Sequence, residues 1–329
     1  MNILRNKAAL FALAVTFAIC AQHPSHAQSP AQAQGQVPGQ APNRFAATVA
    51  PAERFEVGGV LVERHGNRGR PLILVPGLAS GSWVWQDTVR AFAPDHAVYV
   101  LTLPGFDGRP AAGPAPFAAA RAAVEELIAS RRLDQPVLVG HSLGGILALA
   151  VAADRPAAIG GVVSIDGLPV MPGAEDMTPE QRAQFADKTR ARIGQPQPAQ
   201  FAAQQQGYLR TIGVLDMDKA DALAQLSARS DPASVGLWAA DVLSVDLRPQ
   251  LKAIQAPVLA VVPYFDLDGA QQGLTAPAKA DYYRALLDGT PRLQVVTVAP
   301  ARHFAMFDQP QAVEAALRTF LGTLPAPRR

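Results

Sequence analysis

The feature that most constrains the fold is a series of short, mainly apolar runs that alternate with longer helical stretches. The runs lie at 72–75, 98–101, 137–139, 162–165, 258–262 and 293–298. A strand that is buried on both faces of a parallel sheet has this continuous apolar character. The helical stretches that follow them lie at about 84–93, 117–131, 143–154, 277–288 and 311–321.

Two further strands are expected at 54–57 and 60–64, where Gly58-Gly59 separates them as the turn of an opening hairpin. Together these segments predict eight strands, mostly parallel, that are joined by crossover helices. Such an arrangement is typical of a three-layer α/β fold with one sheet between two layers of helices.

The alternation stops between residues 168 and 247. This interval is rich in Gln and Ala and predicts helices at about 179–192, 198–211, 218–229 and 233–243. We expect it to be a helical cap inserted after the sixth strand, over the carboxyl ends of the strands, where open α/β sheets bind ligands. Residues 52–167 and 248–329 would then form the core.

Residues 1–27 have the pattern of a secretory signal peptide. Arg5 and Lys7 precede an apolar run over 8–20, and Ser25-His26-Ala27 places small residues before a cleavage site at Gln28. The run is shorter than the about 20 residues of a membrane span. We therefore expect an exported protein, periplasmic or secreted, without a membrane span once the signal is removed. An uncleaved anchor and a lipoprotein cut at Cys20 are less favoured alternatives.

Residues 28–51 are rich in Gln, Ala, Pro and Gly and are expected to be a flexible leader. The rest of the chain has ample apolar material for a core, since 49% of all residues are hydrophobic and 17% are charged. A net charge of +2 argues against a nucleic-acid binder that relies on bulk charge. The single cysteine, Cys20, would leave with the signal peptide, which excludes thiol chemistry.

The segment Gly140-His141-Ser142-Leu143-Gly144 lies between a buried strand and a helix of small residues. A turn this tight strains the serine backbone, and glycines two positions before and after it remove side chains that would collide. The hydroxyl is then presented at the carboxyl edge of the sheet, near the N-terminus of the helix. We predict that Ser142 is a nucleophile; the alternative is an ordinary strand-to-helix turn.

A serine hydroxyl needs a general base, most often a histidine. Of the six histidines, two would leave with the signal peptide, two are expected at the far side of the sheet, and His141 adjoins the nucleophile in a sharp turn. His303 follows the last strand and is expected beside Ser142, with a hydrogen-bonded loop histidine as the alternative. The acid that orients it should follow a strand. Asp266 is preferred, with Asp268 and Asp166 as alternatives.

An oxyanion needs two backbone N–H donors. Leu143, directly after Ser142, should supply one, and Leu78, in the Gly-rich loop 75–83, the other. Gly77 in that loop would allow a close approach of the backbone. The loop has neither the Gly-Lys-Ser/Thr ending nor the Gly-x-Gly-x-x-Gly spacing of phosphate-binding loops, so nucleotide binding is not expected.

These motifs resemble those of the α/β-hydrolase superfamily, in its capped branch of serine hydrolases, over about 54–322. The resemblance rests on five segments, which are Pro-Gly-Leu-Ala-Ser-Gly-Ser-Trp at 76–83, Leu-Pro-Gly-Phe at 103–106, the Ser142 pentapeptide, Ala-Pro-Val-Leu-Ala-Val-Val at 256–262, and Arg-His-Phe at 302–304. The order Ser142, Asp266, His303 matches that of the family. Two positions depart from it: Pro76 stands where the family usually has His, and Thr102 where Asp is common.

The resemblance and the residues together predict an exported serine hydrolase that cleaves carboxylic esters through an acyl-enzyme. No metal or organic cofactor is implied, and the expected partner is a small-molecule or polymeric ester, not a nucleic acid. Cleavage of an amide, a lactone or a C–C bond by the same residues is the alternative within the hydrolases. A non-catalytic binding protein with this fold is the alternative outside them, and the oligomeric state stays open.

Overall fold

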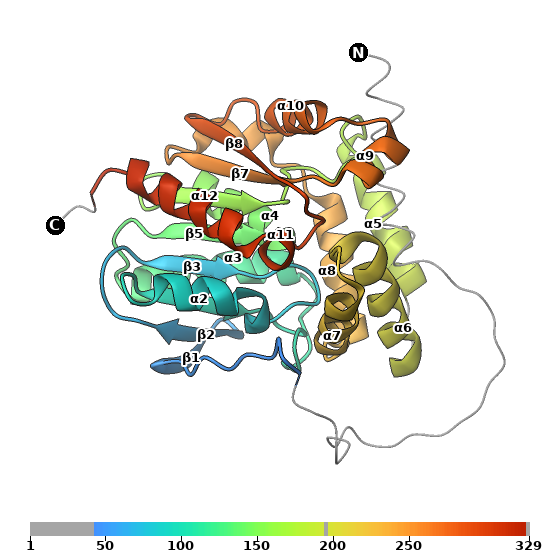
Figure 1. Cartoon of the computed structure of the whole chain (residues 1–329), viewed down its shortest axis with the longest axis horizontal. Helices are drawn as coiled ribbons and strands as arrows, with labels where there is room; N and C mark the ends of the chain where they lie inside the picture. Colours follow the sequence, from blue (N-terminus) through green and yellow to red (C-terminus); the bar gives the residue numbers. More distant parts are fainter. Residues whose placement is uncertain (1–42, 194–196, 327–329) are drawn as a thin grey trace.

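The sheet is the centre of the computed structural model, which describes residues 43–193 and 197–326 (Figure 1). Its eight strands run in the order β1-β2-β4-β3-β5-β6-β7-β8. They are β1 (Glu53–Val57), β2 (Val60–His65), β3 (Leu72–Val75), β4 (Val98–Thr102), β5 (Val137–His141), β6 (Gly161–Ile165), β7 (Val258–Pro263) and β8 (Leu293–Val298). The β1–β2 and β2–β4 pairs are antiparallel and all others are parallel. The expected fold class is therefore confirmed.

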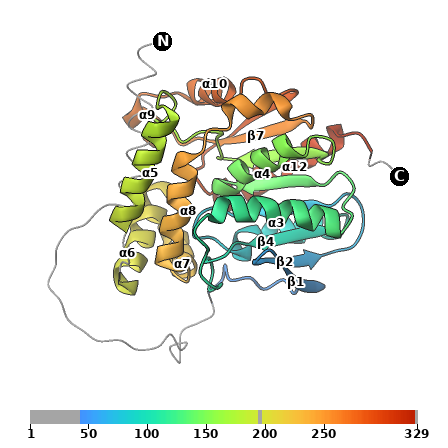
Figure 2. The ribbon, with the colours of Figure 1, turned by 180° about the vertical axis from the view of Figure 1, so that it is seen from behind.

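Helices cover both faces of this sheet. Helices α2 (Gln86–Phe92) and α12 (Pro310–Thr323) lie on the face seen in Figure 1, and α3 (Pro116–Ser130) and α4 (Leu143–Asp154) on the opposite face (Figure 2). Helix α10 (Ala276–Leu286) packs against β7 and β8. Because every residue of β3 to β7 is buried, these strands need apolar side chains on both faces, as their sequences show.

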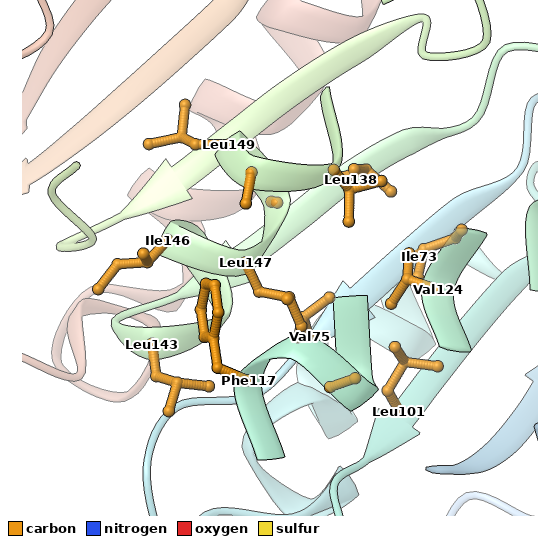
Figure 3. Close-up of a cluster of buried hydrophobic side chains, with 14 of the residues drawn as sticks. Ile73, Val75, Leu101, Phe117, Val124, Leu138, Leu143, Ile146, Leu147 and Leu149 are labelled. Atoms are coloured by element: carbon orange, nitrogen blue, oxygen red, sulfur yellow. The ribbon is translucent and has the colours of Figure 1, made fainter. Parts of the chain in front are cut away.

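The apolar core around α4 holds β5, the strand that leads into this helix, in place. Residues 143–152 of this helix are all buried, so it is apolar on every side. Leu147 and Ile146 lie beside Phe117 of α3, while Val75 and Leu138 come from the sheet (Figure 3). The turn that joins β5 to α4 is therefore anchored at both ends by buried elements.

The interval after β6 contains four helices close to their expected places. They are α5 (Pro179–Ile193), α6 (Pro198–Tyr208), α7 (Met217–Ser227) and α8 (Pro232–Ser244). A π-helical turn, η2 (Leu209–Gly213), joins α6 to α7. The four helices lie together at one end of the sheet (Figure 1). Trp238 Nε1 of α8 donates to the Pro104 carbonyl at 3.0 Å, which ties this cap to the loop after β4.

Three short helical segments complete the core, and all three are absent from the sequence prediction. Segment η3 (Arg248–Ala253) follows the cap and packs on α4. Helix α9 (Asp266–Gln272) follows β7, and α11 (Ala305–Asp308) follows the loop after β8. Four to seven residues are too few to show a helical period, so a sequence pattern does not reveal them. In the described part of the chain, no helix is both long and apolar enough to cross a membrane.

The expected signal peptide and residues 28–42 of the expected leader lie outside the described residues. Residues 43–51 are described, and they contact both the core and α7. The Asn43 amide donates to the Ala222 carbonyl at 2.6 Å, the Phe45 and Phe307 rings meet edge to face, and the backbone N–H groups of Thr48 and Val49 both donate to Gln86 Oε1 at 2.9 Å. This last part of the expected leader is therefore held against the rest of the structure. Isolated anchors without a period leave no pattern for sequence analysis to detect.

Candidate active site

Ser142 stands between β5 and α4 with φ 53° and ψ −121°. A non-glycine residue with positive φ is uncommon, and the strain is typical of a serine nucleophile on a strand-to-helix turn. Its backbone N–H donates to the Ile165 carbonyl at the end of β6, at 2.9 Å. The turn is therefore joined to the neighbouring strand and holds Ser142 at the carboxyl edge of the sheet.

The glycines around Ser142 are needed because backbones approach closely there. A Cβ on Gly140 would lie 2.1 Å from the Gly144 carbonyl oxygen, and one on Gly144 would lie 2.1 Å from the Val75 carbonyl oxygen. The first turn of α4 thus packs directly on the end of β3. Only residues without a side chain at these two positions allow the turn to close.

We expect Gly144→Ala to lower the free energy of unfolding by about 1–3 kcal/mol, because the added methyl group would push α4 away from the β3 backbone. Gly113→Ala is the matched control, since a Cβ there meets nothing within 4 Å. Urea unfolding curves of both variants measure the difference. Equal midpoints for Gly144→Ala and the unaltered protein would contradict the packing argument.

His303 lies in the loop between β8 and α11, and its ring contacts a carboxylate. Nδ1 lies 2.5 Å from Asp166 Oδ2, with only 15% of the His303 side chain and 8% of the Asp166 side chain exposed. Its backbone N–H donates to the Ile212 carbonyl at 3.1 Å, and its own carbonyl lies 3.0 Å from His141 Nε2. The loop is thus held between the η2 turn of the cap and the residue that precedes Ser142.

Asp166 directly follows β6 and has φ 50°. Its Oδ1 accepts a hydrogen bond from the Tyr283 hydroxyl, so both carboxylate oxygens have partners. Burial acts to raise the pKa of Asp166, but His303, Lys279 and Tyr283 together hold that pKa below its usual value. The carboxylate therefore stays ionised beside the imidazole ring.

Asp166 is also close to Ser142. Its neighbour Ile165 accepts the Ser142 N–H, and a Cβ on Gly167 would lie 2.6 Å from the Ser142 carbonyl oxygen. Ser142, Asp166 and His303 follow β5, β6 and β8 at one edge of the sheet. This is the arrangement of groups that a serine nucleophile, its base and the acid behind that base require.

The preference for Asp266 as the partner of His303 is corrected by this geometry. Asp266 is the exposed first residue of α9, and His303 contacts Asp166 instead. Asp268, the other alternative on this segment, forms a two-bond ion pair with Arg302 at 2.8 and 2.9 Å. After β7 the chain continues through two more residues before α9 begins, which carries both acids away from the strand end. Asp166, in contrast, is the first residue after β6.

His141 supports the loop of His303 rather than taking part as a base. Its ring is buried, and the centroids of the His141 and His303 rings lie 4.6 Å apart. Burial and the nearby charge of His303 lower the pKa of His141 to about 3. A neutral His141 can donate from Nε2 to the His303 carbonyl, and this bond holds the His303 loop next to the end of β5.

The loop after β3 lies beside Ser142, which is where the prediction of an oxyanion donor from Leu78 needs it to be. A Cβ on Gly77 would lie 3.2 Å from the Ser142 Cβ and 2.8 Å from His141 Nδ1. Leu78 follows in this loop, and Leu143 begins α4. The Ser227 hydroxyl of α7 donates to the Ala79 carbonyl at 2.9 Å, so the cap also holds the loop. The role of the Leu78 and Leu143 N–H groups stays a prediction.

Three residues of the site were not singled out from the sequence: Tyr208, Lys279 and Tyr283. Tyr208 ends α6, and its ring meets that of His303 edge to face with centroids 6.2 Å apart. Lys279 and Tyr283 come from α10. No motif marks them, because each reaches the site from a helix whose place depends on tertiary packing. Within residues 43–193 and 197–326, no group of His, Cys, Asp or Glu is arranged to hold a metal ion.

Comparison with known sequences identifies the family of this chain. Residues 72–316 match the model of the alpha/beta hydrolase family. The chain is 27% identical over 273 residues to the pimeloyl-[acyl-carrier protein] methyl ester esterase of Aeromonas hydrophila, which covers 80% of this chain and 99% of that protein. It is 29% identical over 261 residues to the biotin biosynthesis bifunctional protein BioHC of Cellvibrio japonicus, covering 77% of this chain but only 48% of that longer protein.

Solved structures share the fold at lower identity. A thermophilic esterase from Thermogutta terrifontis aligns with a TM-score of 0.66 and 21% identity, over 82% of this chain and 98% of that chain. The enol-lactonase from Burkholderia xenovorans aligns with a TM-score of 0.64 and 18% identity, over 82% and 100%. These proteins show the same architecture, and the sequence relatives are esterases and related hydrolases. With the family model matching most of its length, the chain belongs to the alpha/beta hydrolase family and is a hydrolase.

Proposed function

We propose that this protein is an exported serine hydrolase that cleaves carboxylic esters with Ser142 as nucleophile, His303 as base and Asp166 as the acid that orients it. The observation that carries the proposal is the 2.5 Å contact between His303 Nδ1 and Asp166 Oδ2, at the edge where Ser142 occupies its strained turn. A base held this way by a buried carboxylate has its other ring nitrogen available for a serine proton.

The proposed reaction has two halves. Ser142 Oγ attacks the ester carbonyl carbon while His303 Nε2 takes the serine proton, and the backbone N–H groups of Leu78 and Leu143 hold the negative oxygen of the tetrahedral intermediate. His303 then gives the proton to the departing alkoxide. A water molecule attacks the acyl-enzyme with the same base, and the proton returns to Ser142 as the acid product leaves. Asp166 stays ionised throughout and stabilises the imidazolium.

Relatives support the choice of an ester. A methyl ester esterase covers 80% of the chain, and an esterase and an enol-lactonase share its architecture. The substrate would be a small-molecule or polymeric ester that reaches Ser142 beneath the cap. Tyr208 of α6 and Ser227 of α7 place cap residues next to the base and the Leu78 loop. The proposal includes export, which rests on the signal-like pattern of residues 1–27.

The test is hydrolysis of p-nitrophenyl acetate, butyrate and octanoate, with the matching p-nitroanilides as amide controls. We expect turnover of the esters, with an optimum chain length that reports the size of the acyl site, and much slower turnover of the anilides. Cells that express all 329 residues should hold this activity in the periplasmic or medium fraction, on a chain that begins at Gln28. Absence of ester turnover would contradict the chemistry, and an uncleaved chain in the cytoplasm would contradict export.

A further inference from the structure

Helix α10 contributes two polar side chains to the surroundings of Asp166. The Tyr283 hydroxyl donates to Asp166 Oδ1, while His303 lies at Oδ2. The two contacts occupy different oxygens of one carboxylate, so together they define the plane in which the group lies. A carboxylate that could rotate would offer His303 a hydrogen-bond direction that varies, and the ring would lose its fixed orientation.

Lys279 lies one helical turn before Tyr283 on the same face of α10. Its ammonium group donates to the Pro263 carbonyl at the end of β7, at 2.7 Å. Burial lowers the pKa of Lys279, while the charges of Asp166 and Asp268 act to raise it. A positive charge in this enclosed region offsets the negative charge of Asp166.

Titratable side chains reach the surroundings of Asp166 from several elements. His303 comes from the loop before α11, Tyr208 from α6, and the neutral His141 from β5. Tyr283 and Lys279 come from α10, and Asp268 of α9 is bound to Arg302. Lys279 is thus the cation that α10 brings to these surroundings, and its bond to the Pro263 carbonyl joins α10 to the end of β7.

We propose that Tyr283 and Lys279 are positioning residues for the Asp166–His303 pair. Tyr283 fixes the carboxylate so that one oxygen faces His303, and Lys279 holds α10 to the end of β7 through the Pro263 carbonyl, so that the Tyr283 hydroxyl stays within reach of Asp166. This inference rests on the proposed function. It assigns to α10 a task that the arrangement of Ser142, Asp166 and His303 alone does not reveal.

The test compares Tyr283→Phe, Lys279→Met and Lys279→Arg with Tyr282→Phe as the matched control. The Tyr282 hydroxyl bonds Glu175, so its loss removes a partly buried tyrosine bond on the same helix without touching Asp166. We expect Tyr283→Phe to lower kcat about 10- to 100-fold with little change in KM, the range for a lost hydrogen bond to a charged group. Lys279→Met removes the bond to the Pro263 carbonyl and should lower kcat by about 3- to 10-fold, again with little change in KM.

Lys279→Arg keeps a donor for the Pro263 carbonyl and should restore most of kcat, while Tyr282→Phe should leave kcat and KM unchanged. Thermal melts identify any variant that fails to fold, and Tyr283→Phe and Lys279→Arg carry the test if Lys279→Met fails to fold. A normal kcat in Tyr283→Phe, or in a folded Lys279→Met, would overturn the inference. Turnover that survives Ser142→Ala would instead overturn the proposed function, so the two failures are distinguishable.

Discussion

Ser142→Ala should reduce kcat for p-nitrophenyl butyrate by about 10⁴- to 10⁶-fold, the scale seen when a serine nucleophile is removed from an enzyme of this type. The Ser142 hydroxyl is not needed for the fold of the turn, because the positive φ of this residue is held by its backbone N–H bond to Ile165 and by the glycines around it. Alanine has a similar backbone preference, so the variant should fold. Steady-state rates and a thermal melt measure the two properties separately.

The matched control is Ser244→Ala, which removes an exposed hydroxyl at the end of α8 that bonds only within its own helix. Its kcat should equal that of the unaltered protein. A fluorophosphonate probe adds a second readout, since the unaltered protein should be labelled on the peptide that contains Ser142. Equal turnover by Ser142→Ala and the unaltered protein would remove the serine mechanism altogether.

Asp166→Asn is expected to lower kcat by about 10⁴-fold, and Asp266→Asn to leave it within about twofold. An asparagine amide can donate to His303 Nδ1, which would leave the proton on Nε2 and remove the lone pair that should accept from Ser142. Asp266 lies exposed at the start of α9, where an amide of the same shape can still accept from the Tyr264 hydroxyl. Measuring kcat for both variants on one ester separates the two candidate acids directly.

The opposite result, an active Asp166→Asn and an inactive Asp266→Asn, would mean that the contact between Asp166 and His303 has no part in turnover. The pair of variants is informative because each replaces a carboxylate by the amide of the same shape. Differences in rate then report the charge and the proton position, since packing is nearly unchanged. Circular dichroism of both variants confirms that the comparison is made between folded proteins.

The sequence predicted the sheet well because buried parallel strands such as β3 have a direct signature. The run at 72–75 matches β3 at both ends, the run at 293–298 matches the partly exposed edge strand β8, and the helix expected over 143–154 is α4 as observed. Local chemistry also located the turn at Ser142, since Gly140 is required by the Gly144 carbonyl four residues later, although Gly144 is required by the distant Val75 carbonyl of β3. Strands, helices and turns that depend on residues close together in the sequence could therefore be predicted.

The acid could not be chosen in this way. Asp166 and Asp266 both follow apolar runs, and what separates them is the three-dimensional path of the chain after the strand. Asp166 is the first residue after β6 and contacts His303. Asp266 follows β7 after two further residues and begins α9, where its side chain is exposed. Tyr283 was missed for the same reason, because a residue on α10 becomes part of the site only when that helix packs against β7 and β8. Tertiary geometry, not propensity, decides these positions.

The contact between the η2 turn and the His303 loop limits how this protein could be given a new substrate range. Ile212 and Gly213 offer their carbonyls to the backbone N–H groups of His303 and Phe304, at 3.1 and 2.9 Å. A graft that replaced the whole cap would remove these two bonds and with them the support of His303, so we expect it to lose rate together with specificity. Residues 209–213 therefore mark a boundary for engineering: the η2 turn has to be kept, whichever other part of the cap is exchanged.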